Sequence, residues 1–427
     1  MSNKLQVGLA SVDMTPKIGV PLAGYGGERR RIIPWDIFNK YSYCTYLKPS
    51  TGVLDPVRAK AMYLEKPDQR LLFLSLDIVA ITAWMSKQIK QRLSKLGLSE
   101  SEINISATHT HSGSGTLSKS KIWQPLGSDR FQQKIFDKFL LDIEKAVENA
   151  IQNREPATLY TDAFQVEGIQ KNRRDKDGYI DKTVKILLAK SEQNHWMGGL
   201  VNMAIHATAL GSSNLKFSAD MPGGIESGLS KYLDEVNQNA SKFPIEMLFI
   251  NGAEGDITPV YRGLDGIAKT ADIITQEFSR HIDTFKKVKA NWEVDPIDVK
   301  IGKARLKVAL CTKQKGIFKR LVRRLFIPLK RMMPSKTKLH MIKLDNMVML
   351  SWPGEPTAAL GRQLVLKSEA AGWDSCWVMG LTEGHLAYFT TREEYAKRSY
   401  EACSSLYGKD GGEHIVRVYE DLLKQIV

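Results

Sequence analysis

The chain has 427 residues, of which 43% are hydrophobic and 25% charged, as is ordinary for a globular protein with a sizeable core. It contains no run of about 18 apolar residues, which excludes a conventional membrane-spanning helix. The formal net charge of +14 points to an anionic partner only if the basic residues cluster.

The cysteines and the N-terminal sequence indicate the cellular compartment in which the protein is expected. Four cysteines are far apart and form no C-x-x-C pair: Cys44, Cys311, Cys376 and Cys403. We therefore expect reduced, buried thiols. The N-terminal residues lack an apolar stretch of signal-peptide length. Together these features predict a cytoplasmic protein, with no signal peptide or transmembrane segment.

Strand and helix patterns alternate along the chain. Apolar or alternating runs predict strands within 5–16, 57–65, 70–81, 102–113, 183–190, 198–208 and 245–259. Amphipathic spacing predicts helices within 82–97, 130–153 and 222–236, and strand–turn–helix units follow at 340–372 and 375–395. This order predicts an α/β fold with mixed central β-sheets flanked by helices. We expect a single large domain spanning 1–427, with an insertion at 311–338.

The insertion carries much of the positive charge. Between Lys313 and Lys338 there are ten basic residues and no acidic one, and the apolar residues between the basic pairs fall near helical spacing. The pattern predicts a basic amphipathic helix that docks on an anionic membrane surface through 313–331, and that ends or kinks at Pro328. The alternative is an exposed helix packed on its own domain. Nucleic acid is not expected, because few aromatic residues are interleaved.

Two histidines in the sequence SATHTHSG (106–113) raise the first question of chemistry. Residues i and i+2 of a strand point the same way, so His109 and His111 are expected to face one site. They could be metal ligands, a proton-transfer pair, or two hydrogen-bonded histidines without chemistry. This stretch alone does not decide between them.

Three further polar clusters follow predicted strands: 204–224, 249–259 and 351–362. A catalytic zinc site needs three protein ligands, usually histidine and carboxylate, and an open position. His109, His206 and Glu355 could supply them from three separate strand ends. Taken singly, His206 reads equally as a buried hydrogen-bonded histidine, and Glu355 as a helix cap. Together the three favour a metal site.

The order of the motifs resembles the neutral/alkaline (non-lysosomal) ceramidase family. The resemblance rests on SVDMTPKIGVPLAGYGG (11–27), SATHTHSG (106–113), NRR (172–174), IHATALGSSNLKFSAD (205–220), EGDITP (254–259), PGEPTAALGR (353–362) and the tyrosine-rich stretch 380–408. It covers most of the chain, in order, and implies a catalytic domain of the neutral-ceramidase type.

The resemblance implies both a metal site and its catalytic neighbours. It assigns Zn²⁺ to four ligands: His109, His206, Glu355 and Tyr388. His111 would lie beside the metal and handle protons or charge. Arg173 and Tyr400 match positions that contact the polarised amide, where hydrogen-bond donors stabilise developing charge on a carbonyl oxygen.

The chain also departs from the family pattern. The serine of the family's G-D-V-S-P motif, proposed as a nucleophile, is Thr258 here, which favours metal-activated water as the attacking group with Thr258 in support. Arg174, His385 and Ala387 also replace family residues, and this puts the substrate contacts in doubt. We further expect that the family's C-terminal immunoglobulin-like domain is missing.

These features support three hypotheses of function. The first is a zinc-dependent amidase that hydrolyses, or in reverse forms, the N-acyl bond of ceramide or a ceramide-like lipid. The second is a hydrolase of another N-acyl or O-acyl small molecule or lipid, suggested by the departures. The third is a catalytically silent membrane-binding protein, which the presence of all four ligand positions disfavours. The sequence leaves the acyl chain, the base of the lipid and the oligomeric state open.

Overall fold

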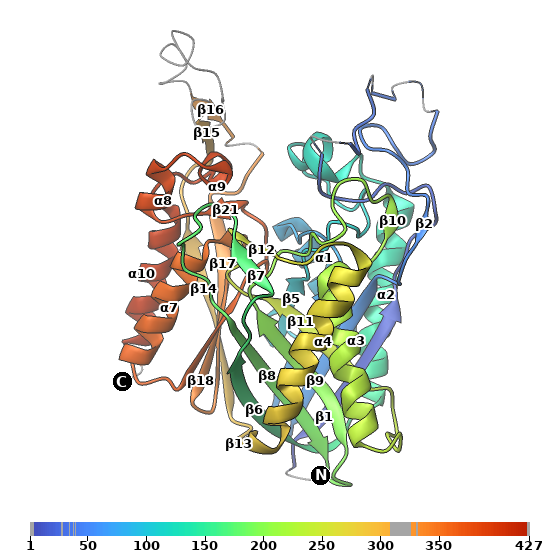
Figure 1. Cartoon of the computed structure of the whole chain (residues 1–427), viewed down its shortest axis with the longest axis vertical. Coiled ribbons are helices and arrows are strands. Elements are labelled where there is room, and N and C mark those ends of the chain that lie inside the picture. The colour runs from blue at the N-terminus through green and yellow to red at the C-terminus, as the bar shows by residue number, and fades with distance from the viewer. Residues whose placement is uncertain are drawn as a thin grey trace.

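The computed structural model describes residues 4–26, 29–33, 35–36, 38, 40–307, 326–329 and 332–424. The fold is α/β, with a large and a small sheet covered by helices (Figure 1). The large sheet has the order β11-β9-β8-β6-β1-β3-β4-β5, and β13 also pairs with β6. Its strands are β1 (Gln6–Asp13), β3 (Arg58–Lys66), β4 (Gln69–Leu76), β5 (Ile103–Ala107), β6 (Glu155–Gln165), β8 (Thr183–Ser191), β9 (Trp196–Met203), β11 (Glu246–Asn251) and β13 (Lys286–Val288).

The small sheet has the order β14-β17-β18-β20. Its strands are β14 (Trp292–Lys300), β17 (Lys336–Leu344), β18 (Met347–Ser351) and β20 (Ser375–Met379). Within these two sheets, the described strands pair in antiparallel fashion except where β4 meets β5, β9 meets β11 and β18 meets β20, which are parallel. Both sheets are therefore mixed.

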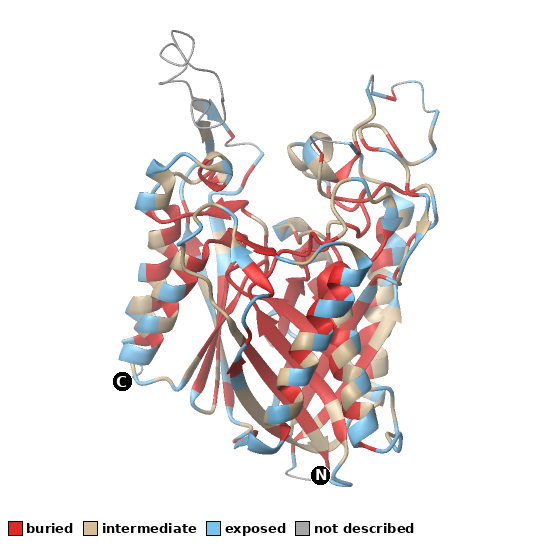
Figure 2. Cartoon of the chain, in the orientation of Figure 1, coloured by how far each residue is buried: buried red, intermediate tan, exposed pale blue. Residues whose placement is uncertain are grey.

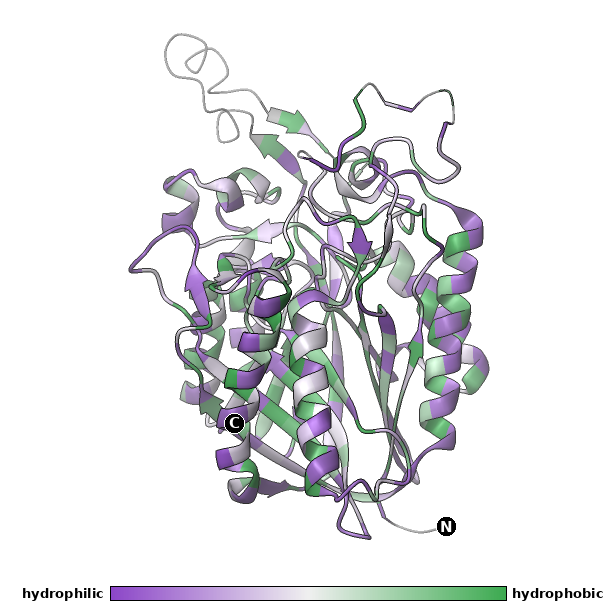
Figure 3. Ribbon diagram, turned by 45° about the vertical axis from the view of Figure 1, so that its right-hand side comes forward, coloured by the Kyte–Doolittle hydropathy of each residue, from purple (hydrophilic) through white to green (hydrophobic). Residues whose placement is uncertain are grey.

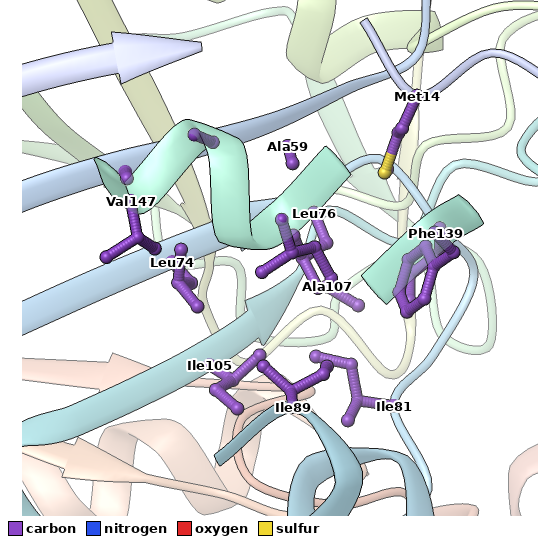
Figure 4. Close-up of a cluster of buried hydrophobic side chains, with 14 of the residues drawn as sticks. Met14, Ala59, Leu74, Leu76, Ile81, Ile89, Ile105, Ala107, Phe139 and Val147 are labelled. Carbon is purple, nitrogen blue, oxygen red and sulfur yellow. The ribbon is translucent and has the colours of Figure 1, made fainter. Parts of the chain in front are cut away.

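Burial explains why the central strands read as continuous apolar runs. Leu71 to Leu76 of β4 are all buried, as expected of a strand covered on both faces. One face packs on α1 (Ala83–Leu93) and α2 (Gln133–Gln152), in the cluster of Figure 4. The other faces a central core shared with β9, β11, β18 and β20 (Figure 2).

Helices cover the outer faces of both sheets. Helices α3 (Asp220–Val236) and α4 (Gly263–His281) pack on β8, β9 and β11, and α7 (Ala358–Ala370) and α10 (Gly411–Leu423) pack on the small sheet. In α2 the buried residues recur at helical spacing, from Phe136 and Phe139 through Ile143 to Val147. Figure 3 shows the result: hydrophobic residues lie on the strands and inner helix faces, and hydrophilic residues lie outside.

The two sheets are joined so that several strands end close together. The side-chain amide of Asn202 on β9 donates to the carbonyls of Ile250 on β11 (2.9 Å) and Val378 on β20 (3.0 Å). Ser75 on β4 donates to the Phe249 carbonyl at 2.6 Å. Strands β5, β9, β11 and β18 consequently run toward the same end of the molecule, the upper end in Figure 1. The loops that leave them meet there.

The prediction of an α/β fold with mixed sheets flanked by helices is confirmed. The prediction of a helix in the insertion is wrong for the part that the structure describes as a strand. Phe326–Pro328 forms strand β16, which pairs with β15 (Arg305–Lys307), so this part of the predicted helix is not helical. A β-hairpin needs long-range pairing that helical spacing does not reveal. Of the predicted helix, residues 313–325 and 330–331 lie outside the described residues.

The cysteine prediction is also corrected. Cys44 and Cys376 are free and buried, as expected, but Cys403 is disulfide-bonded. Sequence separation gave no sign of this bond, because folding brings distant cysteines together. The argument for a reducing compartment therefore loses its basis. Among the described residues, no helix combines the length and apolar character needed to cross a bilayer.

Candidate metal centre

The candidate metal ligands come from both sheets. His109 follows β5, His206 follows β9, and Glu355 lies in the short strand β19 (Glu355–Pro356) just after β18. All three side chains are buried, and one nitrogen or oxygen atom of each lies within 4.8 Å of the others. Residues separated by almost 250 positions thus meet at a single point.

Backbone carbonyls orient the two imidazoles. The Nδ1 of His109 lies 2.6 Å from the Val79 carbonyl oxygen, and the Nδ1 of His206 lies 2.7 Å from that of Glu254. A carbonyl can only accept, so each Nδ1 carries the proton and donates it. The Nε2 lone pairs are left facing the site, which is the arrangement found for metal-binding histidines.

Glu355 completes the set with one oxygen atom. Its Oε2 lies 3.3 Å from the Nε2 of His109 and 3.3 Å from the Nε2 of His206. Its Oε1 is held by the Nε2 of His385 at 3.0 Å. Burial alone would raise the pKa of Glu355, but the three facing imidazoles outweigh it and hold this pKa well below the usual range. Glu355 is therefore ionised, with Oε2 directed at the two histidines.

Tyr388 is placed beside Glu355 by strand pairing. It begins β21 (Tyr388–Phe389), which runs parallel to β19 with Glu355 opposite Tyr388. Its hydroxyl oxygen lies 3.2 Å from His206 Nε2 and 3.2 Å from Arg173 Nη2. Burial, followed by the charge of Glu355, raises the pKa of Tyr388 well above its usual value, whereas a divalent cation would act in the opposite direction.

His111 also reaches the site, but not for the reason that strand geometry suggested. β5 ends at Ala107, and His109 has a left-handed backbone with φ of 68°, so the two histidines are not alternate residues of a strand. The chain turns instead, and places the Nε2 of His111 at 3.3 Å from that of His109. Burial, before the charges of His109 and His206, lowers the pKa of His111 well below its usual value. The imidazole is therefore neutral, and burial opposes its protonation.

Arg173 and Tyr400 lie on the outer side of Tyr388. Arg173 donates from Nε to Glu401 (2.8 Å) and from Nη2 to the Gly255 carbonyl (2.8 Å). The ring of Tyr400 meets that of Tyr388 edge-on at 5.4 Å, and Tyr400 is 63% exposed. Arg173 is therefore fixed by its partners, and Tyr400 is the exposed member of this group.

Thr258 is hydrogen-bonded to Arg262. It is buried in β12 (Ile257–Pro259), and its hydroxyl accepts a hydrogen bond from Arg262 at 2.8 Å. Among the described residues it has no hydrogen bond to His109, His206 or Glu355. The predicted supporting role of Thr258 is therefore not visible as a direct contact with the site.

Four residues of this region were not singled out as functional from the sequence. His385 holds Glu355, Arg262 holds Thr258, and the guanidinium group of Arg30 donates to the His111 carbonyl. The fourth, Glu254, is fully buried, with no hydrogen-bond partner for either carboxylate oxygen among the described residues. Of these four residues, only His385 was noticeable in the sequence, because it departs from the family motif.

Comparisons with known proteins show the family of this chain. The family described as "Neutral/alkaline non-lysosomal ceramidase, N-terminal" matches residues 38–279 and 299–416, which is most of the sequence. The chain belongs to this ceramidase family. Its fold matches the crystal structure of neutral ceramidase from Pseudomonas aeruginosa with a TM-score of 0.81 and 18% identity, over 100% of this chain and 75% of that one. A solved ceramidase complexed with C2 matches with a TM-score of 0.80.

Curated members of the ceramidase family match shorter segments. Neutral ceramidase 1 of Arabidopsis thaliana is 32% identical over 104 residues, covering 22% of this chain and 13% of that protein. Neutral ceramidase of Pseudomonas aeruginosa is 35% identical over 79 residues, covering 18% and 12%. The matched segments thus span about an eighth of these relatives' lengths.

Proposed function

We propose that this ceramidase-family chain is a zinc-dependent amidase that hydrolyses the N-acyl bond of ceramide or a ceramide-like lipid. The observation that carries the proposal is the spacing of three atoms: Nε2 of His109, Nε2 of His206 and Oε2 of Glu355. Ligands about 2.0–2.1 Å from a tetrahedral zinc ion lie about 3.3 Å apart. The carboxylate oxygen lies 3.3 Å from both nitrogens, and the Tyr388 hydroxyl lies 3.2 Å from His206 Nε2. The donor set therefore fits the ion.

The proposed reaction adds water across the amide bond. The products are a fatty acid and an amine, and the same site would form the bond in reverse. Zinc, when bound to His109, His206, Glu355 and Tyr388, supplies Lewis acidity that activates water at neutral pH. His111, kept neutral by burial, accepts a proton and can return it to the leaving nitrogen.

Arg173 and Tyr400 are proposed to receive the amide carbonyl. Arg173 is held by Glu401 and the Gly255 carbonyl, so that its positive charge is positioned before the substrate arrives. A fixed cation stabilises the negative charge that develops on the carbonyl oxygen. Tyr400 lies at the exposed side and would donate its hydroxyl to the same group. Thr258 is proposed to act through Arg262, as a supporting residue.

Metal content tests the proposal directly. We expect about one zinc per chain in wild-type protein by elemental analysis, and loss of the metal in His109→Ala. His414→Ala is the matched control, because among the described residues the side chain of His414 is hydrogen-bonded only to the Lys300 carbonyl and to none of the candidate ligands. Release of fatty acid from a short-chain ceramide should follow the metal in all three proteins. Wild-type protein that neither contains zinc nor takes it up would refute the mechanism.

The substrate needs a separate comparison. His385, Ala387 and Thr258 replace family residues near the site, and this keeps another N-acyl or O-acyl substrate as the second candidate. We expect faster turnover of ceramide than of N-acyl amines that lack the sphingoid base. The reverse order would favour the second candidate. An anionic membrane surface remains the proposed partner of 313–331, most of which lies outside the described residues.

A further inference from the structure

The described residues of the loop 29–48 (29–33, 35–36, 38 and 40–48), called here the apical loop, include large exposed apolar side chains. Ile33 is 83% exposed, Trp35 51% and Phe38 89%. The loop projects from the upper right of the molecule in Figure 1, at the end where the metal centre lies. Single exposed apolar residues are ordinary on soluble proteins, but three within six residues on a projecting loop indicate an interaction site.

The charge of the apical loop suits an anionic partner. It contains five basic residues, Arg29, Arg30, Arg31, Lys40 and Lys48, and one acidic residue, Asp36. Asp36 is buried, and its carboxylate accepts the backbone N–H groups of Lys40 (2.9 Å) and Tyr41 (2.7 Å). The cations Arg29, Lys40 and Lys48 are exposed beside the apolar residues. Exposed apolar side chains accompanied by exposed cations are typical of surfaces that bind anionic lipid bilayers.

The base of the apical loop is fixed to the metal centre. Arg30 is buried and donates to the carbonyls of Ala23 (2.9 Å) and His111. Arg31 donates to the Pro125 carbonyl at 2.6 Å. The carboxylate of Asp129 accepts the N–H groups of residues 45–47 at distances between 2.8 and 3.2 Å. These contacts anchor the base of the apical loop beside the metal centre.

Other apolar side chains are exposed around the same end. Ile327 on β16 is 44% exposed, Met332 40%, Leu126 54%, and Leu264 at the start of α4 54%. The β15–β16 hairpin and the apical loop project from this end in both Figure 1 and Figure 3. A flat lipid surface could contact both projections, with the site between them.

We propose that the apical loop docks this end of the protein on a bilayer containing anionic lipids, with Ile33, Trp35 and Phe38 inserted among the headgroups. The inference rests on the proposed function in one respect: a lipid substrate must pass from a bilayer to the site. Docking itself requires neither bound metal nor turnover. A protein partner or a second copy of the chain would cover the same residues without requiring lipid.

Vesicle binding by the full chain tests the proposal. We expect wild-type protein to co-sediment with phosphatidylcholine vesicles containing phosphatidylglycerol, and less with phosphatidylcholine alone. The double variant Trp35→Ser/Phe38→Ser should bind the anionic vesicles about tenfold less, since it loses two inserted rings. Leu141→Ser/Leu366→Ser is the matched control, because these leucines are 54% and 53% exposed on the outer faces of α2 and α7. The control should bind as wild type does.

Two further readouts separate this proposal from the proposed function. First, turnover of a water-soluble short-chain substrate should be the same in Trp35→Ser/Phe38→Ser as in the wild type. Second, a wild-type protein that binds vesicles but has no amidase activity would refute only the proposed function. Unchanged vesicle binding in the variant would overturn docking by the apical loop. Equal binding of wild type to both vesicle types would overturn the anionic assignment. A change in oligomeric state with unchanged vesicle binding would assign the loop to a self-interface instead.

Discussion

Two buried glutamates near the metal centre, Glu355 and Glu254, have opposite surroundings. Glu355 is 3% exposed and faces the imidazoles of His109, His206 and His385, and its pKa is well below the usual range. Glu254 is 0% exposed, and neither of its carboxylate oxygens has a hydrogen-bond partner among the described residues. Burial, followed by the charge of Glu355, raises the pKa of Glu254 well above its usual value. Equal burial thus gives opposite ionisation, because the facing groups decide which form is favoured.

The largest effect on metal affinity is expected from substitution of Glu355, the ionised glutamate. Glu355→Gln keeps the size of the side chain but removes the negative charge between the two histidines. Loss of a partner that only orients a ligand costs about 10–100-fold in metal affinity, so loss of the carboxylate ligand should cost more than about 100-fold. Competition with a chelator would measure the affinity. Near-wild-type zinc binding by Glu355→Gln would remove Glu355 from the ligand set.

His385 should show how far Glu355 depends on its neighbour. His385→Phe removes the hydrogen bond to Oε1 of Glu355, and we expect metal affinity to fall about 10–100-fold. His385→Gln can still donate from its amide, so it should recover part of the loss. The electronic spectrum of cobalt-substituted protein would report the changed ligand geometry independently of turnover. Equal losses in both variants would argue against a hydrogen bond as the cause.

The smallest effect on zinc binding is expected from substitution of Glu254, the glutamate without a hydrogen-bond partner among the described residues. Glu254→Gln removes a carboxyl group that has no partner to stabilise its charge, so zinc content should stay at the wild-type level. Because the raised pKa keeps the Glu254 carboxyl neutral, the substitution exchanges one neutral polar group for another of similar size, and the free energy of unfolding should change by less than about 1 kcal/mol. Chemical denaturation would measure it. Loss of zinc in Glu254→Gln, as in Glu355→Gln, would mean that both glutamates contribute to metal binding, contrary to this prediction.

Local sequence patterns predicted much of the fold. The apolar runs of β4 and β11 and the spacing of Phe136, Phe139 and Ile143 in α2 identify their elements, because strand and helix periodicity are properties of neighbouring residues. The same reasoning does not mark α4 or β6, and it assigned a helix where β16 forms a strand. The β16 error has a physical reason: its partner β15 lies across the insertion, and pairing over that distance leaves no local pattern.

The sequence by itself determined which residues were candidates for the site. Strand ends and family motifs pointed to His109, His206 and Glu355, and the structure brings these side chains together. Only the tertiary structure decided how each one is held: the left-handed turn at His109, the bond from His385 to Glu355, and the isolation of Glu254. Orientation, burial and ionisation depend on groups that lie far away in the sequence, and folding alone makes them neighbours.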